Sequence, residues 1–135
     1  MSDRDPSDFR YPEALKYGPE HEWSQIGESG IITMGITDFA QDSLGEVQFL
    51  DVPKVGTSVE QGNAIAEVES VKTSSDVHAP CSGEVIEVND ELVQHPELIN
   101  SKPYESWFLR IRASDPGELS KLLDAAGYAR RVTSG

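Results

Sequence analysis

Short runs in which apolar and polar residues alternate fill most of the chain, and they predict a mostly β protein. Two apolar runs, at 23–26 and 31–36, flank a polar loop at 27–30 that is bounded by glycines. This arrangement is typical of a β-hairpin. Between 45 and 89, valine and isoleucine recur among polar residues, and glycine and proline interrupt them at intervals that suit turns.

Two segments carry helix signals. Thr37 and Asp38 are cap-type residues and Gly45 is a stop signal, so a short helix is predicted between them. A second helix is predicted from Asp115, which can cap it, to Gly127. One further turn is expected between Pro96 and Asn100. The predicted C-terminal helix has one apolar stripe, formed by Leu119, Leu122, Leu123 and Ala126.

The length of 135 residues suits one domain. Residues 1–18 mix serine, aspartate and proline with isolated apolar residues, so we expect an N-terminal arm, followed by a single domain over 19–135. A weak repeat is present, since Gly-Glu-Val at 45–47 returns at 83–85. The repeat favours two similar sheets folded over one another, although both glycines also suit ordinary turns.

Charge excludes several classes of partner. The chain has 11 Lys and Arg against 24 Asp and Glu, a net charge of −13. Such a field repels phosphate backbones and anionic bilayers, so no nucleic acid or membrane partner is expected. No apolar run is long enough to span a bilayer, and the first nine residues show no secretory signal. The single Cys81 cannot form an internal disulfide, which suits the cytoplasm.

The sequence lacks the common catalytic motifs. It has no phosphate-binding P-loop, dinucleotide-binding G-x-G-x-x-G, zinc-binding H-E-x-x-H or nucleophile-elbow G-x-S-x-G. His21, His78 and His95 are scattered, and we expect each to be an ordinary solvated or packed side chain. Since His21 and Glu22 are adjacent on a predicted strand, they point to opposite faces and do not converge. We therefore expect no autonomous enzyme and no metal site.

Lys72 is the residue with the clearest potential for chemistry. The residues before it alternate between two faces, and turn formers follow it at 73–76, so Lys72 is predicted at or next to the tip of a hairpin. An accessible lysine on a rigid element can anchor a covalently bound group such as lipoamide or biotin, while the cofactor supplies the chemistry. An ordinary solvated lysine remains an open alternative on this evidence alone.

The segment Glu69-Ser70-Val71-Lys72 resembles the lipoyl-attachment motif of the glycine cleavage system H protein family. The similarity covers about residues 20 to 128, in ordered blocks. Biotin carriers and the lipoyl domains of 2-oxo acid dehydrogenases fit less well, because their lysines are flanked by other residues. The main blocks are His21-Glu22-Trp23, Gly35 to Gln41, Leu44 to Val47, Ser75-Asp76, Ser82 to Asn89, Leu98 to Asn100, Pro103-Tyr104 and Trp107.

The resemblance implies a barrel-sandwich hybrid of the biotinyl/lipoyl-carrier type, with two small antiparallel sheets, short helices and a C-terminal helix. It also implies that Lys72 carries lipoic acid, added by a lipoate-attaching enzyme. Such a carrier takes an aminomethyl group from a PLP-dependent glycine decarboxylase to an aminomethyltransferase, and a dihydrolipoamide dehydrogenase reoxidises it. Glu22 and Asp76 match positions of a groove that shelters the arm, although each could equally be an ordinary surface acid.

Departures from the family pattern leave two other functions open. His78 and Cys81 stand where other residue types are frequent, Phe39 stands where some members have histidine, and the segment 104–107 lacks a usual glycine. Cys81 could exchange with a lipoyl dithiolane, or be a half-buried strand residue. Carriers of this type also serve sulfur oxidation with a heterodisulfide-reductase-like complex, which is the first alternative. The second alternative is an unmodified scaffold or interaction protein.

Overall fold

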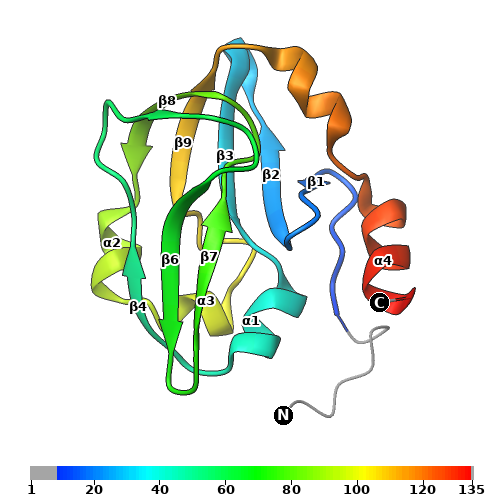
Figure 1. The fold of residues 1–135 in the computed structure, drawn as a ribbon. Coiled ribbons are helices and arrows are strands. Elements are labelled where there is room, and N and C mark those ends of the chain that lie inside the picture. Colours follow the sequence, from blue (N-terminus) through cyan, green and yellow to red (C-terminus); the bar gives the residue numbers. More distant parts are fainter. Residues whose placement is uncertain (1–8, 135) are drawn as a thin grey trace.

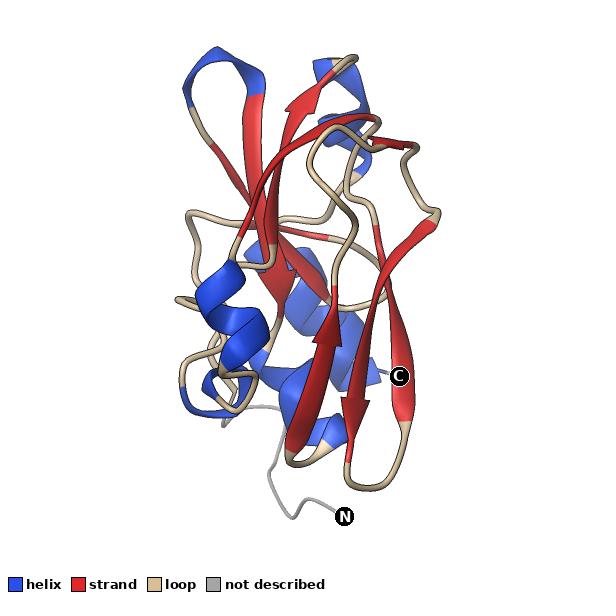
Figure 2. Cartoon of the chain, turned by 90° about the vertical axis from the view of Figure 1, so that its left-hand side faces the viewer, coloured by secondary structure: helices blue, strands red, loops and turns tan. Residues whose placement is uncertain are grey.

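The computed structural model describes residues 9–134, and the chain forms two antiparallel sheets with short helices around them (Figures 1 and 2). The predicted mostly β architecture is confirmed. One sheet has six strands in the order β1 (Lys16–Tyr17), β2 (Glu22–Ile26), β3 (Ile31–Ile36), β9 (Leu109–Ala113), β8 (Gly83–Val88) and β5 (Ser58–Val59). The other sheet has three, β4 (Val47–Asp51), β6 (Ala64–Ser70) and β7 (Ser74–His78).

Short helical segments connect or cover the strands. A one-turn 3-10 helix, η2, joins β2 to β3 in the predicted hairpin. Among residues 9–134 no helix is long and apolar enough to cross a membrane. The helical segments are η2 (Glu28–Gly30), α1 (Asp38–Leu44), α2 (Asp90–Gln94), α3 (Leu98–Ser101), η3 (Pro116–Lys121) and α4 (Ala125–Ser134).

The main core lies between the two sheets. Alternate side chains of the strands point inward and meet there, as expected for strands with one solvated face. Its fully enclosed members include Ile32, Met34, Val68, Val85, Phe108 and Ile111. A smaller aromatic cluster, around Tyr17, Trp23 and Tyr128, attaches α4 to β1 and β2.

Helix α1 begins and ends where the sequence predicts. The Thr37 hydroxyl accepts a hydrogen bond from the Ala40 N–H at 3.2 Å, which makes Thr37 the N-cap. Asp38 instead accepts from the side chain of Gln41 at 2.9 Å. Gly45 ends the helix with a φ of +79°, a conformation that favours glycine.

The prediction of one C-terminal helix ending at Gly127 is wrong. Asp115 caps η3 as expected, accepting from the Gly117 N–H, but the helix stops before Leu123. The backbone of Leu123 forms a β-bridge with Tyr17 through two hydrogen bonds of 2.8 Å each. The Asp124 carboxylate then accepts from the Gly127 N–H at 2.7 Å, so this glycine lies in the first turn of α4. A pairing with a strand more than 100 residues earlier therefore overrides the local periodicity.

Helices α2 and α3 and the N-terminal segment can also be compared with the predictions from sequence. Helix α2 was not predicted, although Asn89 caps it by accepting from the Leu92 N–H at 3.4 Å. The predicted turn at 96–100 is found as α3. Within the predicted arm, Phe9 and Leu15 are buried and β1 joins the six-stranded sheet, whereas residues 1–8 lie outside the described part of the chain.

Candidate functional site

Lys72 lies at the exposed tip of the β6–β7 hairpin, as predicted (Figure 1). Glu69 pairs with Ser74, and a tight turn of three residues, 71–73, joins the two strands. The Ser70 N–H donates to the Thr73 carbonyl at 2.7 Å, and the Ser70 hydroxyl accepts from the N–H groups of Lys72 and Thr73 at 3.3 and 3.2 Å. These bonds fix the direction in which the lysine leaves the hairpin.

The stem of Lys72 runs close to the connection between α1 and β4. A Cβ atom at Gly45 would lie 3.4 Å from Lys72 Cε and 3.9 Å from Nζ. The Val71 N–H donates to the Glu46 carbonyl at 3.0 Å, which ties the hairpin tip to the same connection. The lysine stem therefore lies against Gly45 and the connection that follows α1.

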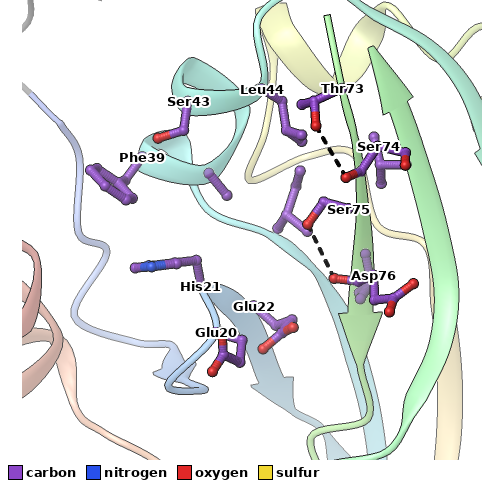
Figure 3. A pocket seen from close by; sticks show the side chains of 14 residues that line it. Glu20, His21, Glu22, Phe39, Ser43, Leu44, Thr73, Ser74, Ser75 and Asp76 are labelled. Atoms are coloured by element: carbon purple, nitrogen blue, oxygen red, sulfur yellow. Dashed lines mark hydrogen bonds between the residues drawn. The ribbon is translucent and has the colours of Figure 1, made fainter.

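A cavity of about 360 Å³ begins beside the hairpin tip and extends between α1 and β7 to the start of β2 (Figure 3). We call it the hairpin groove. Its volume falls within the range of small-molecule sites. Most of its deeper lining is apolar, and its far end is acidic. The residues that line it are Glu20, His21, Glu22, Ile36, Phe39, Ala40, Ser43, Leu44, Val68, Thr73, Ser74, Ser75, Asp76 and Val77.

Glu22 lies in the wall of this groove and is bound to β7. Its carboxylate Oε2 accepts from the backbone N–H of His78 at 2.9 Å and lies 3.0 Å from His78 Nδ1. The residue is buried, and a side chain at Gly18 would meet Oε1 at 2.8 Å. Glu22 therefore bridges the two sheets, and His78 is a bonded partner rather than the solvated or packed side chain that the sequence suggested.

Asp76, the other predicted groove residue, is exposed. Asp76 is one of the residues that line the groove, but Figure 3 shows its carboxyl group directed away from Glu22. In the sheet it pairs with Glu67, whose neighbour Val68 points into the core. The two predicted residues thus line the same groove, but their carboxylates do not form a pair.

His21 takes part in a hydrogen-bonded cluster behind the groove. Its Nδ1 lies 2.9 Å from the Tyr128 hydroxyl, which lies 2.7 Å from the Thr37 hydroxyl. Burial, and secondarily the positive charge of Arg131, lower the pKa of His21. Its φ of +74° is unusual for a residue with a side chain. His21 and Glu22 do not converge, as predicted, and Phe39 packs on the His21 ring.

Glutamine in place of Glu22 will change the pH dependence of stability. Burial raises the pKa of the Glu22 carboxyl above its ordinary value of 4.5, although the bonds from His78 oppose the rise. Its contribution to stability is therefore present below that ordinary value and is lost as pH rises through the folded-state pKa. As pH rises above 4.5, the wild type will lose stability relative to Glu22→Gln.

Urea unfolding across that pH range measures the difference in the free energy of unfolding. Glu20→Gln, which changes an exposed neighbouring acid, serves as the control and should show a weaker trend. If the difference in free energy of unfolding between the wild type and Glu22→Gln stays constant with pH, the raised pKa of Glu22 is contradicted.

Cys81 does not take the half-buried strand position that was expected for it. It lies in the bend between β7 and β8 and has no exposed surface. Burial, and secondarily the charge of Glu118, raise the pKa of its thiol to about 12. Since the thiolate is the form that attacks a disulfide, this environment argues against exchange with a dithiolane.

Some residues support the site in ways that the sequence did not indicate. Ser70 anchors the hairpin turn, Gly45 adjoins the lysine stem, and Thr37 and Tyr128 support His21. The pattern of Ser70 and Thr73 around Lys72 is a local turn signal that was available. The contact between Thr37 and Tyr128 joins residues 91 positions apart, so no local signal could reveal it.

Comparisons with known proteins agree with the resemblance noted above. The family model of the glycine cleavage H-protein matches residues 15–134. The glycine cleavage system H protein of Micrococcus luteus is 53% identical over 124 residues, which cover 90% of this chain and 97% of that protein. A protein of Pyrococcus furiosus described as a probable glycine cleavage system H protein is 49% identical over 123 residues, covering 90% and 92%.

A solved structure gives the same result. The crystal structure of a glycine cleavage system H protein from Mycobacterium marinum matches with a TM-score of 0.83 and 37% sequence identity, over 90% of this chain and 98% of that one. This likeness supports the predicted barrel-sandwich fold. Because the family model and the relatives cover most of the chain, this protein belongs to the glycine cleavage H-protein family.

Proposed function

We propose that this chain is the lipoyl-carrying shuttle protein of a glycine cleavage system, with the lipoyl group on Lys72. The observation that carries the proposal is the position of Lys72 on the exposed, hydrogen-bonded tip of a hairpin from which a groove starts. An amide-forming lysine must be reached by the attaching enzyme, and a rigid root fixes the region that the arm can sweep.

The hairpin groove fits a lipoyl arm in shape and chemistry. Ile36, Leu44 and Val68 line its deeper part and would contact the apolar carbon chain, while Glu22 lies at the end far from the hairpin tip. A carboxylate there can hold a protonated amine through a charge-assisted hydrogen bond. When bound, the lipoyl group would supply a disulfide that opens as one sulfur accepts the aminomethyl group and the other becomes a thiol.

The proposal makes the chain a carrier rather than an enzyme. Its partners would be a PLP-dependent glycine decarboxylase, an aminomethyltransferase, a dihydrolipoamide dehydrogenase and a lipoate-attaching enzyme. Among residues 9–134 no group of three or more His, Cys, Asp or Glu side chains could hold a metal ion. The role of the chain is then to present, orient and shelter the arm.

The comparisons do not favour the two alternatives. Every relative reported above is described as a glycine cleavage H protein, which gives no support to a heterodisulfide-reductase-like partner or to an unmodified scaffold. The cytoplasmic location, the arm over 1–18 and the domain over 19–135 stay predictions.

Exchange of the glycine carboxyl carbon with labelled bicarbonate tests the function. The lipoylated protein, added to a glycine decarboxylase, should support this exchange, and the unmodified protein should support it only weakly. Failure of the lipoylated protein with a decarboxylase that accepts another H protein would contradict the proposal and favour the sulfur-oxidation alternative.

A further inference from the structure

A β-bulge in β4 turns a large apolar side chain out of the protein. The register of β4 against β6 shifts between Val47, which pairs with Ser70, and Phe49, which pairs with Glu69. In a regular strand, Val47 and Phe49 would share a face. Instead Val47 is buried, whereas Phe49 is 65% exposed and the next residue, Leu50, points into the core. Bulges commonly re-aim a side chain in this way.

Phe49 lies on the solvent-facing side of the three-stranded sheet, near the root of the arm. Its cross-strand partner Glu69 is three residues before Lys72, at the end of β6 that leads into the hairpin turn. Val71 at the hairpin tip is also largely exposed, at 57%. Phe49 and Val71 thus place exposed apolar surface between the middle of this face and Lys72.

The same face carries a row of acids. Asp51 pairs with Glu67, and Glu67 pairs with Asp76, so three like charges stand opposite one another across the sheet. Within the described part of the chain none of them forms an ion pair with a cation. Like charges in cross-strand positions destabilise a sheet, so the arrangement costs stability in the free protein. We call Phe49 together with these three acids the outer face.

We propose that the outer face is the docking surface for the enzyme that attaches the lipoyl group, with Phe49 as its apolar anchor. This inference rests on the proposed function, since it assumes that Lys72 is modified. The arm lets other partners react at a distance from its root. The attaching enzyme alone must bring its active site to the Lys72 Nζ atom, next to this face.

Charge favours the same partner. Amide formation at an amine requires an activated acyl donor, either an acyl-adenylate or a thioester on a phosphopantetheine carrier, and both donors carry phosphate. The attaching enzyme therefore needs positive charge around its active site, and the acidic row complements it. A desolvated aromatic anchor surrounded by a polar rim is the usual composition of an interface centre.

The rate of modification of the unmodified protein tests the proposal. The probe is a lipoate-attaching enzyme of the same host with its own donor, ATP and lipoic acid for a ligase or the acyl-carrier thioester for a transferase, and intact mass follows the reaction at Lys72. Phe49→Ala should lower kcat/KM for the protein substrate by about tenfold or more, as loss of an aromatic hot spot does. Ile26→Ala, an exposed strand residue of the other sheet, should leave it unchanged.

Long incubation should still load Phe49→Ala, and the loaded variant should support decarboxylase exchange like the loaded wild type. Equal attachment rates for Phe49→Ala and wild type would overturn the inference while leaving the proposed function intact. A wild type that is never modified would instead overturn the proposed function. Slower exchange by the loaded variant would overturn the inference and assign this face to the decarboxylase. A wild-type dimer that Phe49→Ala dissociates, with no change in the attachment rate, would assign the face to a second copy of this chain.

Discussion

Arginine in place of Lys72 will abolish both lipoyl attachment and decarboxylase exchange, the largest functional effect expected from any single substitution. Arginine keeps the positive charge and much of the length of the side chain, but its guanidinium is a poor nucleophile that stays protonated. Lys72 is exposed and its backbone, not its side chain, makes the hydrogen bonds of the turn. The fold should therefore survive the change.

Intact mass after incubation with the attaching enzyme measures the first loss, and labelled bicarbonate exchange the second. Lys54→Arg, at an exposed lysine before β5, is the matched control and should retain both activities. Thermal unfolding should give a similar Tm for the two variants and the wild type. Residual attachment in Lys72→Arg would show that another lysine carries the group.

Alanine in place of Gly83 will produce the largest loss of stability. Gly83 begins β8, pairs with Ala113 of β9, and has its Cα very close to the neighbouring strand. A Cβ at this position would lie 2.1 Å from the Arg112 carbonyl oxygen and 2.9 Å from its carbon. These are backbone atoms of a central pairing, so relief requires the two strands to separate. We expect a cost of about 3 kcal/mol or more.

Gly62→Ala separates this steric effect from backbone conformation. Gly62 has a φ of +87°, but no atom lies within 4 Å of the position of an added Cβ. Its replacement should cost about 1 to 2 kcal/mol, the price of a left-handed conformation alone. Urea unfolding measures both variants. Equal losses would contradict the close approach of β8 and β9.

Local sequence signals were sufficient where structure is decided within a few residues. The turn formers after Lys72 indicated the hairpin tip, and Thr37 and Gly45 marked the ends of α1. The alternating pattern indicated a mostly β protein, and the weak repeat favoured two sheets. These features depend on hydrogen bonds and side-chain directions that neighbouring residues determine.

Contacts between residues far apart in the sequence could not be predicted in this way. The carboxylate of Glu22 meets His78, which is 56 positions away, so the sequence suggested two unrelated side chains. The apolar spacing that includes Leu123 predicted one continuous helix, because no local signal indicates that Leu123 pairs with Tyr17. Similarly, β4 reads as a strand, but its bulge and the outward turn of Phe49 follow from the register with β6.

The proposed carrier function depends most directly on the chemical state of Lys72 in the cell. The measurement is intact-mass and peptide mass spectrometry of the protein purified from its native host, grown with lipoate. We expect a mass increase of one lipoyl group, located on the peptide that contains Lys72. A chain that remains unmodified under these conditions, or that carries the group on another lysine, would contradict it.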